Sequence, residues 1–132
     1  MLFRFFPSHE LGRRGEWFAA WFYRLRGFRI VARNVRTRGG EIDLIVRRGG
    51  TLAFVEVKAR ASAAAGEGSD AVTREKQSRI ARLAGRWLAQ HPHEGEVRYD
   101  VLSLRWTGLR FVATQFANAF QTVTTGLRLA NA

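Results

Sequence analysis

The sequence has 132 residues, of which 46% are hydrophobic, so its apolar content is ample for one domain with a single core. It contains no cysteine, which excludes disulfide bonds and thiolate metal sites and is compatible with a reducing cytoplasm. The formal net charge of +11 favours a polyanionic partner, with nucleic acid first and an anionic membrane surface second.

Residues 1 to 8 are expected to form a poorly ordered lead. Their apolar run is cut by Arg4 and Pro7 and is too short for a secretory signal or a membrane span. We therefore expect a cytoplasmic protein that does not enter the membrane.

Residues 9 to 26 have apolar side chains at helical spacing and are followed by Gly27, which predicts a first helix. Trp17 and Trp21 widen its predicted buried stripe, and core packing is favoured for them over stacking on nucleic-acid bases. The stripe itself consists of Leu11, Phe18, Phe22 and Leu25. Glu16 lies off the stripe, beside small residues that would let the helix pack close to a sheet. Its carboxylate could reach a site there as a metal or water ligand, or it could pair with a surface arginine such as Arg13.

Residues 28 to 37 alternate in polarity and predict a first strand, with charge toward one rim from Arg29, Arg33, Arg36 and Arg38. Gly39-Gly40 predicts a turn into residues 40 to 60, GEIDLIVRRGGTLAFVEVKAR, which predict a β-hairpin around Gly49-Gly50. If these two glycines form the turn, opposed residues have numbers that sum to 99. This register sets Asp43 opposite Glu56 and Glu41 opposite Lys58, with all four on one face.

Carboxylates directly opposed on one face destabilise a sheet unless they share a proton or bind a cation. Oxygen ligands of this kind suit Mg²⁺ or Mn²⁺, and Lys58 could hold or activate a nucleophilic water beside the metal. The alternative is a surface hairpin with an ordinary ion pair between Glu41 and Lys58. The apolar opposite faces of both strands favour a buried site instead.

The stretch from 61 to 70 is small and contains glycine, which predicts a loop that is either a plain linker or a segment that closes over a substrate. Residues 72 to 90 predict a second helix with Thr73 as its N-cap. Its buried face consists of Ile80, Leu83, Ala84, Trp87 and Leu88. Lys76 projects along this face, so its ammonium would either point toward the sheet, where a phosphate could be held, or reach solvent by snorkelling. The exposed side adds attraction to phosphate through Arg74, Arg79, Arg82 and Arg86.

Residues 97 to 106 predict a fourth strand, on which Arg98 and Asp100 share a face and either form an ion pair or lie near the site. Residues 109 to 113 predict a short strand, 114 to 120 a short helix and 121 to 132 a weakly ordered tail. The order helix, three strands, helix, strand predicts the α/β class, with a small central mixed β-sheet flanked by helices. The domain is expected to span residues 1 to 120.

The spacing of Asp43 and Glu56-Val57-Lys58 resembles the PD-(D/E)XK nuclease superfamily. More closely, residues 10 to 120 are similar to the YraN-like family of small bacterial proteins. The motifs that carry this likeness are GRRGE at 12 to 16, RN at 33 to 34, GEIDLI at 40 to 45, FVEVKAR at 54 to 60, Lys76 and RYDV at 98 to 101.

This resemblance implies a restriction-endonuclease-like fold in which Asp43, Glu56 and the Val57 carbonyl bind Mg²⁺. It further implies that Lys58 positions the attacking water and that Glu16 is an additional acidic member. Ile42 stands where the superfamily motif has proline, which is common in this branch and removes no ligand.

We therefore expect a deoxyribonuclease dependent on Mg²⁺ or Mn²⁺, with branched DNA and repair intermediates among its candidate substrates. Glu41 and Lys76 would support the site, and nucleic-acid contacts are expected from Arg33, Arg36, Arg38, Arg60, Arg74 and Arg79. The alternative is a non-catalytic nucleic-acid-binding module that retains the fold, while an anionic-membrane adaptor rests on charge alone and ranks last. The oligomeric state stays open, with a homodimer among the alternatives.

Overall fold

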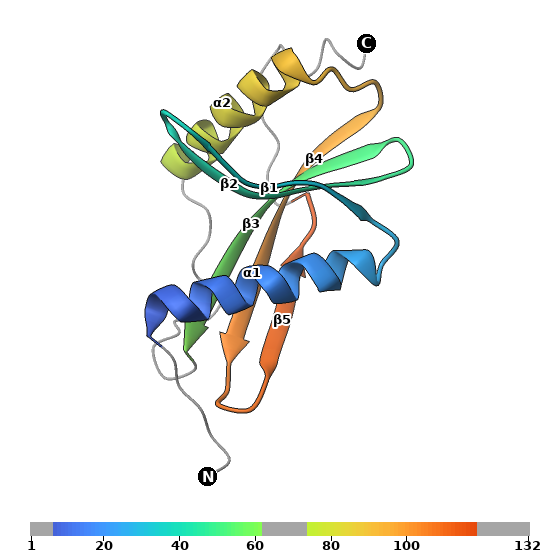
Figure 1. Cartoon of the computed structure of the whole chain (residues 1–132). Helices are drawn as coiled ribbons and strands as arrows, with labels where there is room; N and C mark the ends of the chain where they lie inside the picture. Colours follow the sequence, from blue (N-terminus) through green and yellow to red (C-terminus); the bar gives the residue numbers. More distant parts are fainter. Residues whose placement is uncertain (1–6, 62–73, 119–132) are drawn as a thin grey trace.

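A computed structural model describes residues 7–61 and 74–118. They form one five-stranded sheet with two helices, in the chain order α-β-β-β-α-β-β (Figure 1). The elements are α1 (Ser8–Arg24), β1 (Arg29–Thr37), β2 (Gly40–Arg48), β3 (Thr51–Ala61), α2 (Arg74–Gln90), β4 (Glu96–Trp106) and β5 (Phe111–Phe116). The predicted α/β class with a mixed central sheet is confirmed.

The strands lie in the order β1-β2-β3-β4-β5, and only the β3–β4 pair is parallel. A parallel pair needs a long crossover, and α2 lies in the connection that supplies it. Pairing of β3 with β4 runs over their full lengths, from Thr51↔Glu96 to Ala61↔Trp106. The long β3–β4 pair therefore forms the rigid centre of the fold, from which β1 and β2 extend on one side and β5 on the other (Figure 1).

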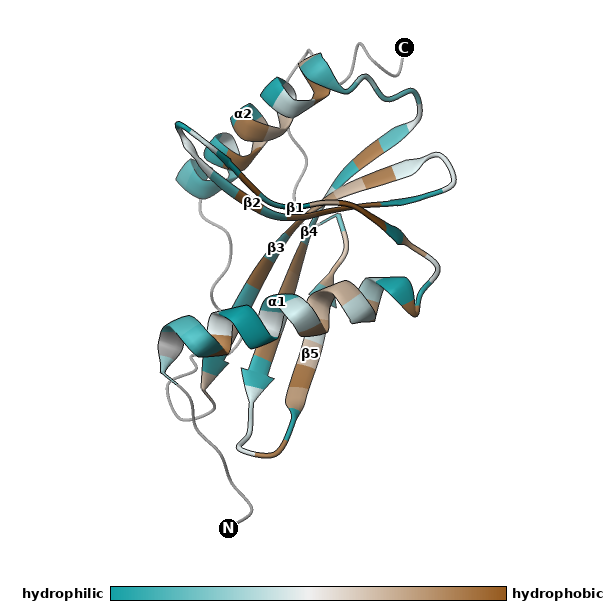
Figure 2. Ribbon diagram, in the orientation of Figure 1, coloured by the Kyte–Doolittle hydropathy of each residue, from teal (hydrophilic) through white to brown (hydrophobic). Residues whose placement is uncertain are grey.

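The two helices cover opposite faces of this sheet. One buried cluster packs α2 against Ile42, Ile45 and Phe54, whereas the other packs α1 against Leu44 and Val46 and their neighbours. Figure 2 shows strongly hydrophobic residues in the central strands, between the two helices. The sheet is thus buried on both sides where β2, β3 and β4 run together, as the apolar runs of these strands predict.

The buried face of α1 differs from the predicted stripe. Trp17 is 64% exposed, Trp21 44% and Leu25 77%, so the prediction that these three pack in the core is wrong. Leu11 is buried as predicted, and Phe18 and Phe22 are partly buried. The fully buried positions between them are Ala19, Ala20 and Tyr23.

Close packing explains which face of α1 lies against the sheet. A Cβ added at Gly15 would lie 2.8 Å from Cβ of Ala59 on β3, closer than real side chains approach. The helix therefore approaches the sheet through its smallest residues, and a tryptophan on this side would hold it away. Glu16 follows Gly15 directly, so the close approach brings its carboxylate to the sheet.

The hairpin between β2 and β3 has the predicted register near its turn. Gly49 has φ of +60°, a conformation that favours glycine, and Gly49-Gly50 separates the two strands. The ladder runs from Arg48↔Thr51 to Leu44↔Val55, and these numbers sum to 99 as expected. Within the described strands, the ladder stops there, so the predicted Asp43–Glu56 and Glu41–Lys58 rungs are not part of it.

The predicted alternation of faces along β2 is also wrong beyond this point. Ile42 and Ile45 belong to the same buried cluster under α2, whereas strict alternation would put them on opposite faces. The pairs Arg33↔Leu44 and Val35↔Ile42 set Asn34 on β1 across from Asp43. Asn34 has φ of +49°, in the left-handed region, so the regular pleat is interrupted where Asp43 lies.

Two smaller predictions differ from the structure. Arg38 and Gly39 form the turn between β1 and β2, because Gly40 already pairs with Thr37. Residues 114 to 116 belong to β5 and pair with β4, so the predicted helix does not begin there. Ser8 is the first residue of α1 and Ala61 the last residue of β3, so these two positions are not part of the predicted lead at 1 to 8 or the predicted loop at 61 to 70. The remaining positions of these predictions at 1 to 6 and 62 to 70, the cap at Thr73 and the tail at 121 to 132 lie outside the described residues.

Asp100 on β4 ties α1 to the sheet on the face opposite α2. Its side chain is buried and forms the predicted ion pair with Arg98, with Nε and Oδ1 3.0 Å apart. The Tyr23 hydroxyl donates a hydrogen bond of 2.8 Å to Asp100 Oδ2, and the backbone N–H of Asn118 donates to Oδ1. Burial first, and then the Asp100 carboxylate, raise the pKa of Tyr23, so the phenol remains a donor. The negative charge of the buried Asp100 is therefore stabilised by groups from α1, from β4 and from the turn after β5.

Candidate metal centre

Three carboxylates meet where α1 crosses β2. Glu16 from α1 and Glu41 and Asp43 from β2 each offer an oxygen atom, and these atoms lie within 4.8 Å of one another. Glu41 is exposed, whereas Glu16 and Asp43 are half-buried. Oxygen donors at this spacing suit a hard divalent cation such as Mg²⁺ or Mn²⁺.

Asn34 holds two of these carboxylates together. Its Nδ2 donates hydrogen bonds of 2.9 Å to Oε1 of Glu16 and of 2.9 Å to Oε2 of Glu41. Asparagine tolerates the left-handed backbone that β1 adopts here better than most residues do. Sequence reasoning assigned no role to Asn34, although an asparagine inside a predicted strand is unusual enough to have drawn attention to it.

Asp43 is the carboxylate of the cluster whose pKa is raised, to about 7. Burial is the largest cause, and the negative charges of Glu16, Glu56 and Glu41 add to it. The backbone N–H of Val57 donates a hydrogen bond of 2.8 Å to Asp43 Oδ2, which opposes the rise. A bound cation would relieve the repulsion within the cluster, so the donor set fits a metal.

Glu56 contributes to this site from β3, with a partner of its own. Its Oε2 lies 3.2 Å from Nζ of Lys76 in the first turn of α2. A side-chain hydrogen bond with Lys58 and the charge of Glu56 both raise the pKa of Lys76, so this ammonium stays protonated. The prediction that Lys76 points toward the sheet agrees with this geometry, but a carboxylate occupies the place where a phosphate was expected.

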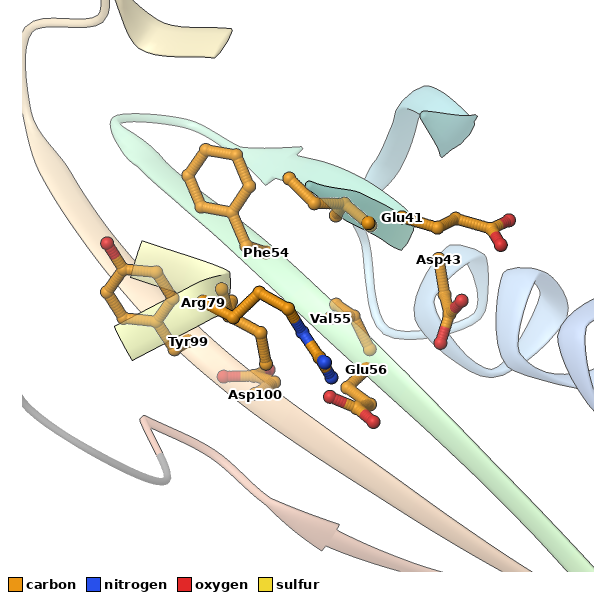
Figure 3. A pocket seen from close by; sticks show the side chains of 11 residues that line it. Glu41, Asp43, Phe54, Val55, Glu56, Arg79, Tyr99 and Asp100 are labelled. Atoms are coloured by element: carbon orange, nitrogen blue, oxygen red, sulfur yellow. The ribbon is translucent and has the colours of Figure 1, made fainter. Parts of the chain in front are cut away.

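A cavity of about 260 Å³ connects the acidic residues of β2 with those of β3 beneath α2. Figure 3 shows Glu41, Asp43 and Glu56 along this cavity, and the Arg79 side chain of α2 extends toward Glu56. Phe54 and Tyr99 close the opposite end with their rings stacked 5.8 Å apart. The cavity therefore has an acidic end, a basic side chain on its wall and an aromatic base.

Several predicted site residues lie elsewhere than expected. Glu41 pairs with Arg36 on β1, whose Nε is 3.8 Å from Oε2, instead of lying opposite Lys58. Lys58 lies on β3, and its side chain shares a hydrogen bond with Lys76 of α2. The Val57 amide group is placed beside Asp43 by the hydrogen bond described above.

The arginines predicted to bind nucleic acid are distributed over β1, the turn after it, β3 and α2, and two of them lie at the site: Arg36 pairs with Glu41 and Arg79 lines the cavity. Arg33 and Arg36 lie on β1 with Arg38 in the following turn, and all three are exposed. Arg60 is half-buried near the end of β3, and Arg74 and Arg79 are exposed on α2. Positive charge therefore adjoins the acidic residues at Arg36 and Arg79.

The fold and the arrangement of acidic residues together indicate a class of protein fold. A mixed sheet of order α-β-β-β-α-β-β, with acidic residues on the two strands of its central hairpin, is consistent with a restriction-endonuclease-like fold. The sequence pattern of the family described as "Uncharacterised protein family UPF0102" matches residues 15–104. The chain belongs to this family, which is the YraN-like family, so the resemblance found in its motifs is confirmed.

Relatives in distant bacteria show the same family. The chain is 53% identical over 98 residues to a UPF0102 protein of Parafrankia sp., which covers 74% of this chain and 83% of the relative. It is 49% identical over 100 residues to one of Clavibacter michiganensis, covering 75% and 85%. It is also 49% identical over 98 residues to one of Symbiobacterium thermophilum, covering 74% and 83%.

Among the described residues, no helix is long and apolar enough to cross a membrane.

Proposed function

We propose that this protein is a metal-dependent endonuclease that hydrolyses phosphodiester bonds in DNA. The observation that carries the proposal is the half-buried Asp43, which lies with Glu16 and Glu41 within 4.8 Å and has its pKa raised to about 7. Three carboxylates at this spacing repel one another and would repel the phosphate backbone that a net charge of +11 is suited to attract, and a bound cation relieves both repulsions.

Each residue would have a definable role. Glu16, Glu41 and Asp43 would hold Mg²⁺ or Mn²⁺, with Glu56 as a further acidic neighbour on β3. When bound, the ion would supply Lewis-acid stabilisation of the charge that develops on the phosphate. Asn34 keeps Glu16 and Glu41 in place, and the Val57 N–H orients Asp43.

Two lysine side chains complete the arrangement. Lys58, whose side chain shares a hydrogen bond with Lys76, would position the attacking water by hydrogen-bonding it. Lys76 stays protonated and holds the Glu56 carboxylate, so the orientation of Glu56 is fixed before substrate arrives. Arg79 and the exposed arginines of β1 would bind the phosphates on either side of the cleaved bond. The expected place of action is the cytoplasm.

Cleavage of branched, flapped and linear DNA in the presence of Mg²⁺ or Mn²⁺ tests this proposal. We expect Asp43→Ala and Lys58→Ala each to lower the rate by at least about a hundredfold. Glu94→Ala is the matched control, since it removes an exposed carboxylate from the loop after α2. Equal cleavage by the wild type and both site variants would show that the activity comes from a contaminant.

A non-catalytic nucleic-acid-binding module is the second candidate, and one observation favours it. Glu56, a predicted metal ligand, is engaged by Lys76 at 3.2 Å, which reduces the negative charge available to a metal. This candidate predicts DNA binding that weakens with salt but no metal-dependent turnover. Calorimetric titration of Mn²⁺ into the protein separates the two, because only the enzyme needs a metal bound by Asp43.

A further inference from the structure

The outward side of α1 carries exposed tryptophans between arginines. Trp17 and Trp21 are 64% and 44% exposed, and they are four residues apart, so their side chains are neighbours on the helix surface. We refer to this side as the Arg/Trp face, which consists of Arg13, Arg14, Trp17, Trp21 and Arg24. All five residues are exposed, and α1 crosses in front of β3, β4 and β5 in Figure 1.

We propose that the Arg/Trp face binds an unpaired strand of nucleic acid, with bases stacked on Trp17 and Trp21 and phosphates bound by the arginines. Stacking on an aromatic side chain needs an open base face, which a single strand offers and an intact duplex does not. Trp17 is the residue after Glu16, so the face lies on the same turn of α1 that brings Glu16 to the acidic cluster. The inference names the substrate class of that site and in this respect rests on the proposed nuclease function.

The arginines near the end of α1 are held against aromatic rings. The Arg24 guanidinium lies 5.0 Å from the centre of the Trp21 ring, and that of Arg26 lies 3.5 Å from the Phe22 ring. Arg26 also donates a hydrogen bond of 3.0 Å to the Phe22 carbonyl oxygen. Ordered guanidinium groups lose less side-chain entropy when they bind a phosphate. A strand that runs from Trp17 toward Trp21 therefore meets positive charge along its path.

Charge argues against the other occupants of an exposed aromatic face. A second copy of this chain would bring a second set of arginines against the first, and like charges in an interface are strongly unfavourable. A membrane surface would need α1 to insert its apolar side, but Ala19, Ala20 and Tyr23 on that side are completely buried against the sheet. A polyanion with flat apolar groups matches both properties of the face.

Binding measured without cleavage tests the proposal. In EDTA, labelled oligo-dT and a blunt duplex of equal length are titrated with wild type and with the double variant Trp17→Leu, Trp21→Leu. We expect the double variant to bind oligo-dT at least about tenfold more weakly, because stacking is lost, while duplex binding changes less than about twofold. The double variant Trp17→Phe, Trp21→Phe should stay within about threefold of wild type. The same holds for the control Leu25→Ala, which removes an aliphatic side chain more exposed than either tryptophan.

Equal binding of oligo-dT by wild type and the leucine variant would overturn the inference. Loss of a dimer in the leucine variant, seen by sedimentation, would assign the face to a second copy. Tryptophan-dependent binding to anionic vesicles that survives excess oligo-dT would assign it to a membrane, and either result would also overturn the inference. If the leucine variant loses oligo-dT binding while no DNA is cleaved with any metal, the Arg/Trp face binds single strands and the nuclease proposal is wrong. If DNA is cleaved but the leucine variant binds and cleaves like wild type, the nuclease proposal is supported and the proposed role of the Arg/Trp face is wrong.

Discussion

The Asp43 carboxylate accepts the backbone N–H of Val57 at 2.8 Å, in the place where a rung of the β2–β3 ladder was expected. The side chain of one strand thus satisfies the main chain of the other, and the two strands can separate without leaving this amide unpaired. Glu41 and Asp43 of β2 and Glu56 of β3 line the opening between the two strands. A local break in the sheet is therefore what creates room for the candidate metal centre.

The raised pKa of Asp43 predicts how stability depends on pH in the absence of metal. Its folded-state pKa of about 7 lies above the ordinary 3.8, so its contribution is full below pH 3.8 and is lost as the pH rises through 7. Asp43→Asn removes the charge and should exceed wild type by about 2 kcal/mol in unfolding free energy at pH 8, with little difference at pH 4. Urea denaturation in EDTA measures this, with Glu94→Gln as the control. A difference between Asp43→Asn and wild type that does not change with pH would contradict the prediction.

Metal should reverse this loss of stability. At a concentration about a hundredfold above the dissociation constant, a bound ion stabilises the folded protein by about 2.7 kcal/mol. Mn²⁺ should therefore raise the melting temperature of wild type at pH 8 by several degrees, and EDTA should remove the effect. Asp43→Asn and Glu16→Gln should show a much smaller rise, whereas Glu94→Gln should behave like wild type. The same rise in all four proteins would mean that the ion binds elsewhere.

The ion pair between Lys76 and Glu56 predicts an effect on metal affinity. Lys76→Gln leaves the Glu56 charge uncompensated beside the acidic cluster, so Mn²⁺ should bind about threefold to tenfold more tightly. Arg74→Gln removes the same charge from an exposed position two residues earlier in α2 and serves as the control. Calorimetry at matched ionic strength measures both dissociation constants. Weaker binding to Lys76→Gln would show that Lys76 supports the site in another way.

Two properties of Asn34 should contribute to the stability of the protein: its hydrogen bonds to two carboxylates and its tolerance of a left-handed backbone. Asn34→Ala removes the donor shared by Glu16 and Glu41 and should lower the free energy of unfolding by about 1–2 kcal/mol. Asn34→Gly also lacks the amide but accepts φ of +49° without strain, so it should be about 1 kcal/mol more stable than the alanine variant. Urea denaturation of wild type and both variants under one set of conditions separates the lost hydrogen bonds from the backbone strain. Identical stability of the two variants would exclude backbone strain at this position.

The close contact at Gly15 predicts opposite effects for neighbouring glycines of α1. Gly15→Ala puts a methyl group 2.8 Å from Ala59 and should destabilise the protein by about 1–3 kcal/mol. Gly12→Ala meets no atom within 4 Å and should stabilise it by up to about 1 kcal/mol through helix propensity. Thermal or urea unfolding measures both variants. A stable Gly15→Ala protein would mean that α1 can move away from β3 at little cost.

Local patterns in the sequence were sufficient for much of the fold. Gly49-Gly50 fixed the hairpin register as far as Leu44↔Val55, because turn chemistry and alternation act over a few residues. The Arg98–Asp100 ion pair also follows from neighbours on one strand. The proximity of Lys76 to β3 could be predicted because a lysine on the apolar face of a helix has to find a partner or reach solvent.

The remaining features depend on packing that the local sequence does not specify. The apolar stripe of α1 favoured Trp17 and Trp21 as core residues, but the face that lies against the sheet carries the small residues Gly15, Ala19 and Ala20 together with Tyr23. The arrangement of the carboxylates depends on the left-handed Asn34 on a different strand, which interrupts the alternation on which the predicted face was based. A prediction of which acidic residues meet therefore needed the backbone of β1 as well as the hairpin.

The hydrogen bond between Tyr23 and Asp100 joins residues that are 77 positions apart in the chain. Glu16, Glu41 and Asp43 are all synthesised early, and the hairpins of β1, β2 and β3 can form from contacts that are local in sequence. The anchor of α1, however, is complete only when β4 has docked in parallel beside β3, a contact that forms slowly because of its long sequence separation. We therefore expect the acidic cluster to assemble late in folding, so a nascent or truncated chain that lacks β4 should contain every carboxylate and still bind no metal.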